Sequence, residues 1–255
     1  MEKTKQGHIN SDIKNGLATI EFYHPSHNSL PSMLLGQLAS KIMEVGQNDE
    51  VKLILLKSKG ERTFCAGASF DELVSIDNKA NGKTFFMGFA NVINAIRTCG
   101  KIVIGRVQGK AVGGGVGLAS AVDYCMATKF SLVKLSELAV GIGPFVIGPA
   151  VERKIGLAAF SQMAINATEW QTAEWARDRG LYQEVFDNAE FMDAYIERFT
   201  TTLLTMNPTA LNKLKEVFWE GTENWDTLLE TRAEISGELV LSDFSKKTIQ
   251  SFLKN

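Results

Sequence analysis

Cysteine and histidine are scarce in this chain of 255 residues, which holds three of each. The cysteines, Cys65, Cys99 and Cys125, are odd in number and lack CxxC spacing, which argues against a disulfide framework or a structural zinc site. Such cysteine usage favours a reducing compartment, so we expect a cytoplasmic protein. The histidines are not spaced as metal ligands, and the sequence therefore predicts no metal centre.

The chain also lacks a large excess of positive or negative charge and a long hydrophobic run. The chain has 27 basic and 29 acidic residues and no block of five lysines or arginines, so we expect no nucleic-acid partner. The longest apolar segment, Leu138 to Val151, is too short and too broken by Gly and Pro to span a bilayer. Residues 1–16 are polar and lack the apolar stretch of a signal peptide, and we expect no membrane partner.

The composition is that of a globular protein, with 45% apolar and 22% charged residues, and the length suits one large domain. A β-hairpin is predicted near the start of the chain. Its signals are the segment 9–13, the Asn15-Gly16 turn dipeptide and the run 17–22, in which apolar residues alternate.

Strand-like and helix-like segments alternate through the first half of the chain. Met33–Val45 has apolar residues at helical spacing, and the continuous apolar run Val51–Lys57 is typical of a buried strand. The order recurs in a helix at 85–96, strands at 101–107 and 123–127, and a short helix after the glycine cluster between them. This alternation predicts an α/β core.

Beyond Gly148 the pattern becomes nearly all helical. The predicted helices there are 150–154, 158–165, 172–178, 191–204, 208–219, 225–241 and a last one through 252. No Ser/Pro/Gly-rich linker separates the two halves and no internal repeat is visible, so we expect one cooperative unit.

Two glycine-bearing turns, Phe64–Leu73 and Gly109–Ala119, each follow a predicted strand and lead towards a helix. Small residues allow a ligand close to the backbone, and free N–H groups at a helix start attract developing negative charge. Two such turns facing each other would form an oxyanion hole, although glycine in a turn more often serves sterics alone. Neither GxGxxG with a ribose acid nor GxxxxGK[ST] is present in the second turn, which weakens dinucleotide and P-loop interpretations.

The chain resembles the crotonase superfamily, also called the enoyl-CoA hydratase/isomerase family, over nearly all of its length. Four segments carry the resemblance: His24-Pro25-x-x-Asn28-Ser29-Leu30, Phe64-Cys65-Ala66-Gly67-Ala68, Gly109-x-x-x-Gly113-Gly114-Gly115 followed by Asp123, and Ser136-Glu137-Leu138-x-x-Gly141-x-x-Pro144. The resemblance implies an α/β spiral of repeated β-β-α turns, with a spiral core over residues 1–200 and a C-terminal helical trimerisation region over 201–255. It also implies a homotrimer or homohexamer.

The same resemblance implies an acyl-CoA thioester as substrate, with coenzyme A as part of the substrate and no separate cofactor. The thioester oxygen would be held by the backbone N–H groups of Ala68 and Gly114 while an enolate forms. The positions that would contact substrate or coenzyme A are Ser26, Asn28, Ala66, Ser69, Phe70, Val112, Gly117, Ser136, Val140 and Gly141. For Asn28 there is an equally good alternative, a cap for the helix that starts near Pro31.

The acid/base residues are the most informative part of the resemblance. Family hydratases carry one glutamate at the position that is Gly117 here and a second at the position of Glu137. Apolar neighbours of Glu137 would raise its pKa towards the range of a general acid/base, whereas the alternative is a solvent-facing carboxylate at a strand end.

One glutamate suits proton transfer between carbons of the acyl chain, while water addition is served by two. Some family hydratase/lyases nevertheless keep only this glutamate, so isomerase and hydratase both remain open. The alternative from a different class is a catalytically silent CoA-binding or scaffold member of the family. The length of the acyl chain is not readable, because the depth of the pocket would depend on Ser75–Phe89, and that region carries no clear motif.

Two further expectations concern structure. The resemblance makes Asp123 a structural, hydrogen-bonded carboxylate, and we expect the tryptophans 170, 175, 219 and 225 in core or interface rather than in a stacking platform. Apolar residues in the helical tail motivate the oligomer, namely Leu228, Leu229, Ile235, Leu239 and Val240.

Overall fold

A computed structural model describes residues 7–252 of the chain, so residues 1–6, on which the expectation about a signal peptide partly rests, lie outside the described residues. Within the described part, the chain starts with the antiparallel hairpin β1 (His8–Lys14) and β2 (Leu17–Tyr23). Asn15 and Gly16 at its tip have φ of 52° and 88°, the left-handed conformation that a two-residue hairpin turn requires. The predicted hairpin is confirmed.

The strands form two sheets. The first has the order β1-β2-β3-β5-β7-β9 and the second β4-β6-β8. Their bounds are β3 Leu53–Ser58, β4 Thr63–Cys65, β5 Ile102–Val107, β6 Lys110–Val112, β7 Tyr124–Thr128, β8 Val133–Lys134 and β9 Glu184–Phe186. From β3 to β8, each β-β-α turn gives one strand to each sheet, and apart from the hairpin all pairings are parallel. The expected α/β spiral is confirmed.

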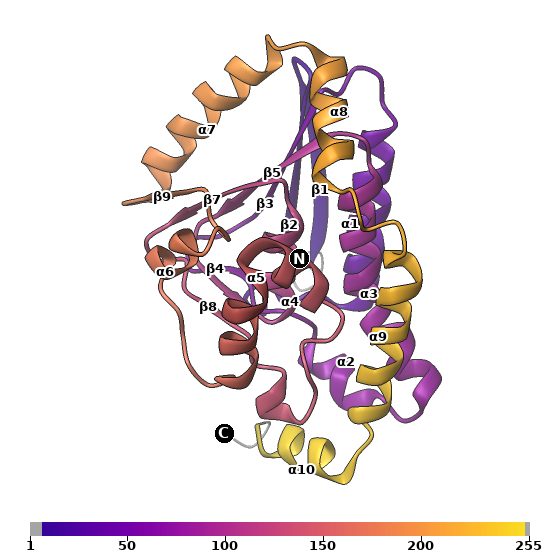
Figure 1. Ribbon diagram of the computed structural model, residues 1–255. Helices are drawn as coiled ribbons and strands as arrows, with labels where there is room; N and C mark the ends of the chain where they lie inside the picture. The colour runs from indigo at the N-terminus through magenta and orange to yellow at the C-terminus, as the bar shows by residue number, and fades with distance from the viewer. Residues whose placement is uncertain (1–6, 253–255) are drawn as a thin grey trace, which may run out of the picture.

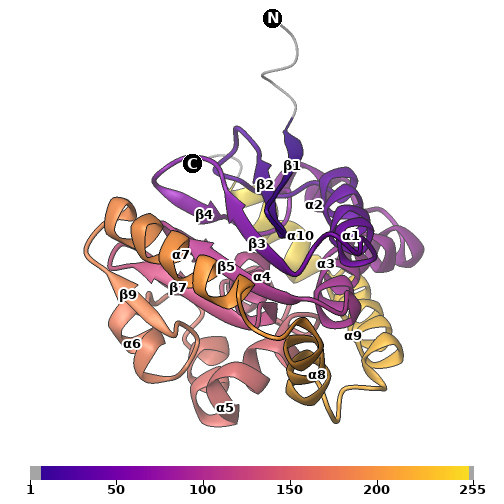
Figure 2. The ribbon, with the colours of Figure 1, turned by 90° about the horizontal axis from the view of Figure 1, so that it is seen from above.

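Helices cover both faces of the larger sheet (Figures 1 and 2). One face packs on α1, α3 and α4, and the opposite face is covered by α7 and α8 through Met192, Ile196 and Leu211. The helices are α1 Ser32–Gly46, α2 Phe70–Ser75, α3 Lys79–Thr98, α4 Gly114–Ala121, the 3₁₀ turn η1 Leu138–Val140, α5 Gly148–Ile165, α6 Ala173–Asp178, α7 Ala189–Leu204, α8 Pro208–Phe218, α9 Trp225–Leu239 and α10 Asp243–Phe252.

The helical second half agrees with the prediction at α5 and differs from it at β9. The two predicted segments 150–154 and 158–165 are confirmed as two helical parts of α5, because Gly156 between them has a non-helical conformation (φ 75°, ψ 160°). The sequence missed β9, a half-buried strand of three residues that extends the sheet beside β7. A boundary at residue 200 falls inside α7. Between residues 7 and 252 no helix is long and apolar enough to cross a membrane.

A buried ion pair ties α8 to the sheet. Lys215 Nζ lies 2.7 Å from Asp123 Oδ2, and both side chains are 2% exposed. The backbone N–H of Val103 and Nε1 of Trp219 also donate to this carboxylate, at 2.7 and 2.8 Å. The structural role expected for Asp123 is confirmed, because its carboxylate charge is fully paired inside the protein.

Candidate active site

A cavity of about 140 Å³ lies where both glycine turns meet α3 and the segment that follows β8. Seven of the predicted site residues line it: Ala66, Ala68, Phe70, Gly114, Ser136, Glu137 and Val140. The rest of the lining was not among the predicted site residues, although Ile142 and Phe145 were expected as apolar neighbours of Glu137; it includes Phe85, Phe86, Phe89, Ile142, Phe145, Ile147 and Ser236. Those residues come from α3, α9 and the loop before α5, and only folding brings them together.

Two backbone N–H groups point to an anion-binding function for the cavity. Within the described chain, neither the N–H of Ala68 nor that of Gly114 donates a hydrogen bond. Ala68 is held in place by its neighbours, since Leu30 N–H donates to Gly67 O and Ser69 N–H donates to Leu30 O. Gly114 is the first residue of α4, where backbone donors have no partner in the helix and the helix dipole is positive.

The two donors lie close together. A Cβ built on Gly67 would be 3.5 Å from the backbone nitrogen of Gly114, which places the two turns side by side. Gly67 and Gly113 have φ of 91° and 52°, so the residue before each donor adopts a conformation that favours glycine.

Each residue of the triplet Gly113-Gly114-Gly115 is packed too closely to accept a side chain. A Cβ on Gly113 would lie 2.8 Å from Glu137 Oε1, one on Gly114 would collide with the ring of Phe89, and one on Gly115 with Cys65 O. The triplet therefore allows close contact between α4, the first turn, α3 and the glutamate.

Glu137 immediately precedes η1 and directs its carboxylate into the cavity. The residue as a whole is half-buried, but its Oε2 is buried and has no hydrogen-bond partner in the described structure. Burial in these apolar surroundings raises its pKa to about 7. Near neutral pH the group therefore populates both protonation states, as a general acid/base requires.

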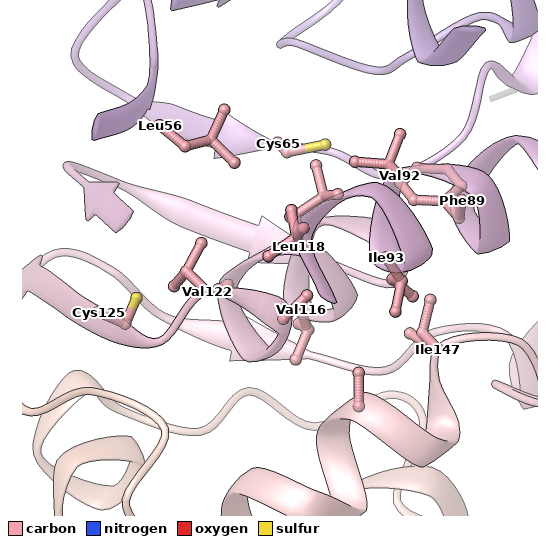
Figure 3. Close-up of a cluster of buried hydrophobic side chains, with 14 of the residues drawn as sticks. Leu56, Cys65, Phe89, Val92, Ile93, Val116, Leu118, Val122, Cys125 and Ile147 are labelled. Atoms are coloured by element: carbon pink, nitrogen blue, oxygen red, sulfur yellow. The ribbon is translucent and has the colours of Figure 1, made fainter. Parts of the chain in front are cut away.

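Gly117, predicted to contact substrate, does not line the cavity. It lies in the buried helix α4, and a Cβ there would be 2.5 Å from Ile147 Cγ2 and 2.7 Å from Ile147 Cβ. Figure 3 shows Ile147 in the same hydrophobic cluster as Val116 and Ile93. The space where a side chain at position 117 would begin is occupied by hydrocarbon.

Asn28 is buried and has a structural role that differs from the predicted cap. Its Nδ2 donates to Lys59 O and Thr63 O, both at 2.9 Å, and its Oδ1 accepts from His24 N–H. The cap position of α1 is Pro31, and Glu72 accepts from Ser32 N–H at 2.9 Å in place of a local cap. Asn28 therefore shapes the loop, because all of its polar side-chain atoms are occupied.

Four other predicted contact residues also lie outside the cavity lining, namely Ser26, Ser69, Val112 and Gly141. Ser26 is exposed in the loop before α1. Ser69 caps α2, since its Oγ accepts from Glu72 N–H. Gly141 has φ of 78° and its carbonyl oxygen accepts from Ser245 Oγ at 3.1 Å, so it joins η1 to α10.

A second hollow, of about 830 Å³, shares Ala66 with the cavity and also contains Val112. Cationic side chains flank it, including Arg62, Lys110 and Lys129. Lys110 and Lys134 hold their Nζ atoms 5.0 and 4.6 Å from the ring centroid of Trp170, which is 37% exposed.

Of the tryptophans, Trp219 and Trp225 are core residues as expected, while Trp170 faces this hollow. The residues described contain no cluster of three potential metal ligands, and the expectation of a metal-free site stays a prediction.

Comparison with known proteins gives one consistent picture. The family model described as enoyl-CoA hydratase/isomerase matches residues 12–255. A short-chain-enoyl-CoA hydratase of Clostridium acetobutylicum is 27% identical over 229 residues, which are 89% of this chain and 87% of that protein. A peroxisomal Delta(3,5)-Delta(2,4)-dienoyl-CoA isomerase of Arabidopsis thaliana is 26% identical over 78% of this chain and 76% of its own. The crystal structure of an enoyl-CoA hydratase from Bacillus halodurans superimposes with a TM-score of 0.88 at 21% identity, covering 95% of this chain and 99% of that one.

Proposed function

Because this chain belongs to the enoyl-CoA hydratase/isomerase family, also called the crotonase superfamily, we propose that it is an enoyl-CoA isomerase. In this proposal the enzyme moves the double bond of an acyl-CoA thioester between the 3- and 2-positions, and Glu137 carries the proton. The observation that supports it most is the buried Oε2 of Glu137, which has no hydrogen-bond partner in the described structure, in one cavity with the free N–H groups of Ala68 and Gly114.

The proposed reaction has two proton transfers. The thioester oxygen accepts hydrogen bonds from Ala68 and Gly114, and the carboxylate of Glu137 removes a proton from carbon 2 of a 3-enoyl-CoA. The electron pair of that C–H bond delocalises into a dienolate, whose negative oxygen is stabilised by both donors and by the N-terminus of α4. Glu137 then returns its proton to carbon 4, which leaves the double bond at position 2.

The position of Ile147 favours isomerisation over hydration. Addition of water needs a group that holds and orients the water, and a second carboxylate does this in two-glutamate hydratases. Here Ile147 covers Gly117, so the corresponding wall is apolar. A cavity with this apolar wall and one carboxylate suits proton transfer within the substrate.

Coenzyme A would occupy the second hollow, which shares Ala66 with the cavity. Arg62, Lys110 and Lys129 suit the phosphate groups, and the exposed ring of Trp170 offers an aromatic surface to the nucleotide. Because backbone donors polarise the thioester, the proposed reaction needs neither a metal nor a cofactor beyond the coenzyme A of the substrate.

A catalytically silent CoA-binding protein is the competing proposal. A buried carboxylate oxygen without a hydrogen-bond partner destabilises a fold, and a silent scaffold would gain nothing from keeping Oε2 of Glu137 in that state. The burial of Glu137 therefore favours an enzyme.

The deciding experiment assays the purified protein for both reactions. We expect conversion of a 3-enoyl-CoA to the 2-enoyl-CoA, with slower formation of the 3-hydroxyacyl-CoA from the same 2-enoyl thioester. Hydration that outpaces isomerisation would establish a single-glutamate hydratase instead. Binding of acyl-CoA without either reaction would support the silent member.

A further inference from the structure

We infer that the acyl group is short and uncharged, with about four to six carbons, because an aromatic wall of α3 and its contact with α9 close the cavity. This inference rests on the proposed function and specifies its substrate. The residues that set the limit are Phe85, Phe86 and Phe89 on α3 and Ser236 on α9.

The size of the cavity limits the chain. Its volume is about 140 Å³. An engineered apolar cavity of about 150 Å³ in another protein holds one benzene molecule, which has six carbons. The cavity must also take the carbons next to the thioester, so a chain of eight or more carbons would not fit inside.

The aromatic wall begins at the oxyanion donors and runs away from them. The ring of Phe89 packs directly on Gly114, and Phe85 lies one helical turn earlier on the same face of α3. Four residues of helix correspond to about 6 Å along its axis. The rings of Phe85 and Phe86 meet edge to face at 5.1 Å and 90°, so they fill the far part of the wall.

Phe85 is packed at the far end of this wall. It is buried in a hydrophobic cluster with Leu73, Ile142, Val240 and Ile249, of which Leu73 and Ile142 also line the cavity. The cluster joins α3 to α2, the loop after η1, the end of α9 and α10, and Figure 1 shows α9 running alongside α3. A longer acyl chain would have to displace Phe85 from this cluster.

The wall is also held rigidly. Gly82 of α3 and Gly237 of α9 touch through their backbones, since a Cβ on Gly82 would lie 2.7 Å from Gly237 O. Lys83 of α3 makes ion pairs of 2.6 and 2.8 Å with Glu230 and Glu234 of α9. Moving α9 away to admit a longer chain would break these contacts together.

The lining excludes charge at the end of the chain. Among the described residues that line the cavity there is no lysine, arginine or histidine, and the one ionisable side chain is Glu137. Ser236 Oγ already donates to Arg232 O. A terminal carboxylate would be buried without a cation and close to a second carboxylate, which strongly disfavours it.

The test measures dissociation constants of the full-length protein for saturated acyl-CoA thioesters from acetyl to decanoyl by calorimetry. We expect affinity to rise to butyryl or hexanoyl and to fall by about tenfold or more at octanoyl and beyond. Glutaryl-CoA, which carries a terminal carboxylate, should bind about a hundredfold more weakly than pentanoyl-CoA of the same length. Affinity that keeps rising to decanoyl, or equal binding of glutaryl and pentanoyl thioesters, would overturn the inference.

A matched pair of variants tests the wall itself. Phe85→Leu shortens the ring at the far end while keeping an apolar core residue, so the preferred chain should lengthen by one or two carbons. Phe199→Leu is the control, because Phe199 packs on Tyr124 and Tyr195 in the cluster under α7, away from the cavity. A chain-length profile of Phe85→Leu that matches the control would overturn the role of Phe85.

Failure of the proposed function would look different. Tight binding of hexanoyl-CoA and weak binding of decanoyl-CoA, with no turnover of any enoyl thioester, would keep the inference about the cavity and overturn the reaction. Turnover of decenoyl-CoA as fast as that of hexenoyl-CoA would keep the reaction and overturn the inference.

Discussion

Ile147 lies directly over Gly117: a side chain starting at position 117 would meet the Cγ2 atom of Ile147 at 2.5 Å. The two residues are thirty positions apart in sequence and belong to α4 and the loop before α5. The packing therefore leaves no room for a second carboxylate at position 117, because the side chain of Ile147 occupies the space that it would need.

This contact predicts how a second acid can be introduced. Gly117→Glu alone should destabilise the fold, since the new side chain collides with Ile147 and buries a charge. Gly117→Glu combined with Ile147→Ala should raise the ratio of hydration to isomerisation by about tenfold or more, because a second carboxylate can orient water. Both rates are measured on one substrate.

Ile147→Ala is the control for that double variant, since it opens the same space without adding an acid. The proposed effect of a glutamate at position 117 would be contradicted if the ratio of hydration to isomerisation were no higher in the double variant than in Ile147→Ala.

Removing the proton carrier should abolish most of the activity. Glu137→Gln keeps size and polarity but cannot accept a proton, so kcat should fall by about 10²–10⁴. Affinity for acyl-CoA should change little, because Glu137 lines the acyl cavity and not the second hollow. In the wild type, kcat/KM should rise with pH through about 7, the pKa of Glu137, since its deprotonated form is the base.

Glu50→Gln, at an exposed turn position, serves as the control and should keep wild-type rates. A flat pH profile of the wild-type kcat/KM between pH 6 and 8 would argue against Glu137 as the base.

The same raised pKa predicts a pH dependence of stability. Between about 4.5 and about 7 the folded state keeps the proton of Glu137 while the unfolded state has lost it, so stability falls as the pH rises. Relative to Glu137→Gln, the wild type should lose about 3 kcal/mol of unfolding free energy across this range. Urea denaturation of both proteins at pH 4.5 and pH 8 measures the difference. A difference that does not change with pH would contradict the buried, protonated carboxylate.

Gly114→Ala tests the oxyanion donor through sterics. The new methyl group meets the ring of Phe89, so the backbone N–H should shift and kcat should fall by about 10²–10³. Gly36→Ala is a matched control in α1, because a Cβ there has no atom within 4 Å and should leave kcat unchanged. Gly114→Ala with wild-type kcat and an unchanged melting temperature would remove Gly114 from the proposed site.

The homotrimer or homohexamer expected from the resemblance should have a mass of three or six times 28.0 kDa by light scattering. Of the residues that motivated this expectation, Leu229 and Val240 are buried within the subunit, whereas Leu239 is 37% exposed. A larger exposed apolar surface is provided by α5, where Leu157 is 64% and Ile165 is 72% exposed.

Leu157→Asp should therefore reduce the mass of the assembly, and Met33→Asp, at an exposed apolar position on α1, should not. A wild-type mass of 28.0 kDa at micromolar concentration would rule out the oligomer.

The amino-acid sequence by itself determined the local elements and the chemistry that depends on neighbouring residues. Hydrophobic spacing located the hairpin, the α/β core and the C-terminal helices, because periodicity of two or 3.6 residues reports directly which face is buried. The glycine turns are visible in the sequence, Ala68, Gly114 and Glu137 were assigned to the site from the family resemblance, and the structure places all three around one cavity.

Tertiary structure alone decided the contacts between distant segments. Asn28 looked like a helix cap from its neighbours, but its partners Lys59 and Thr63 lie more than thirty residues away. Likewise, Ile147 covers Gly117, and Phe85 and Ser236 bound the acyl cavity from helices far apart in sequence. Spacing along the chain does not encode such contacts, because they depend on how helices and sheets approach one another when side chains pack to fill the core.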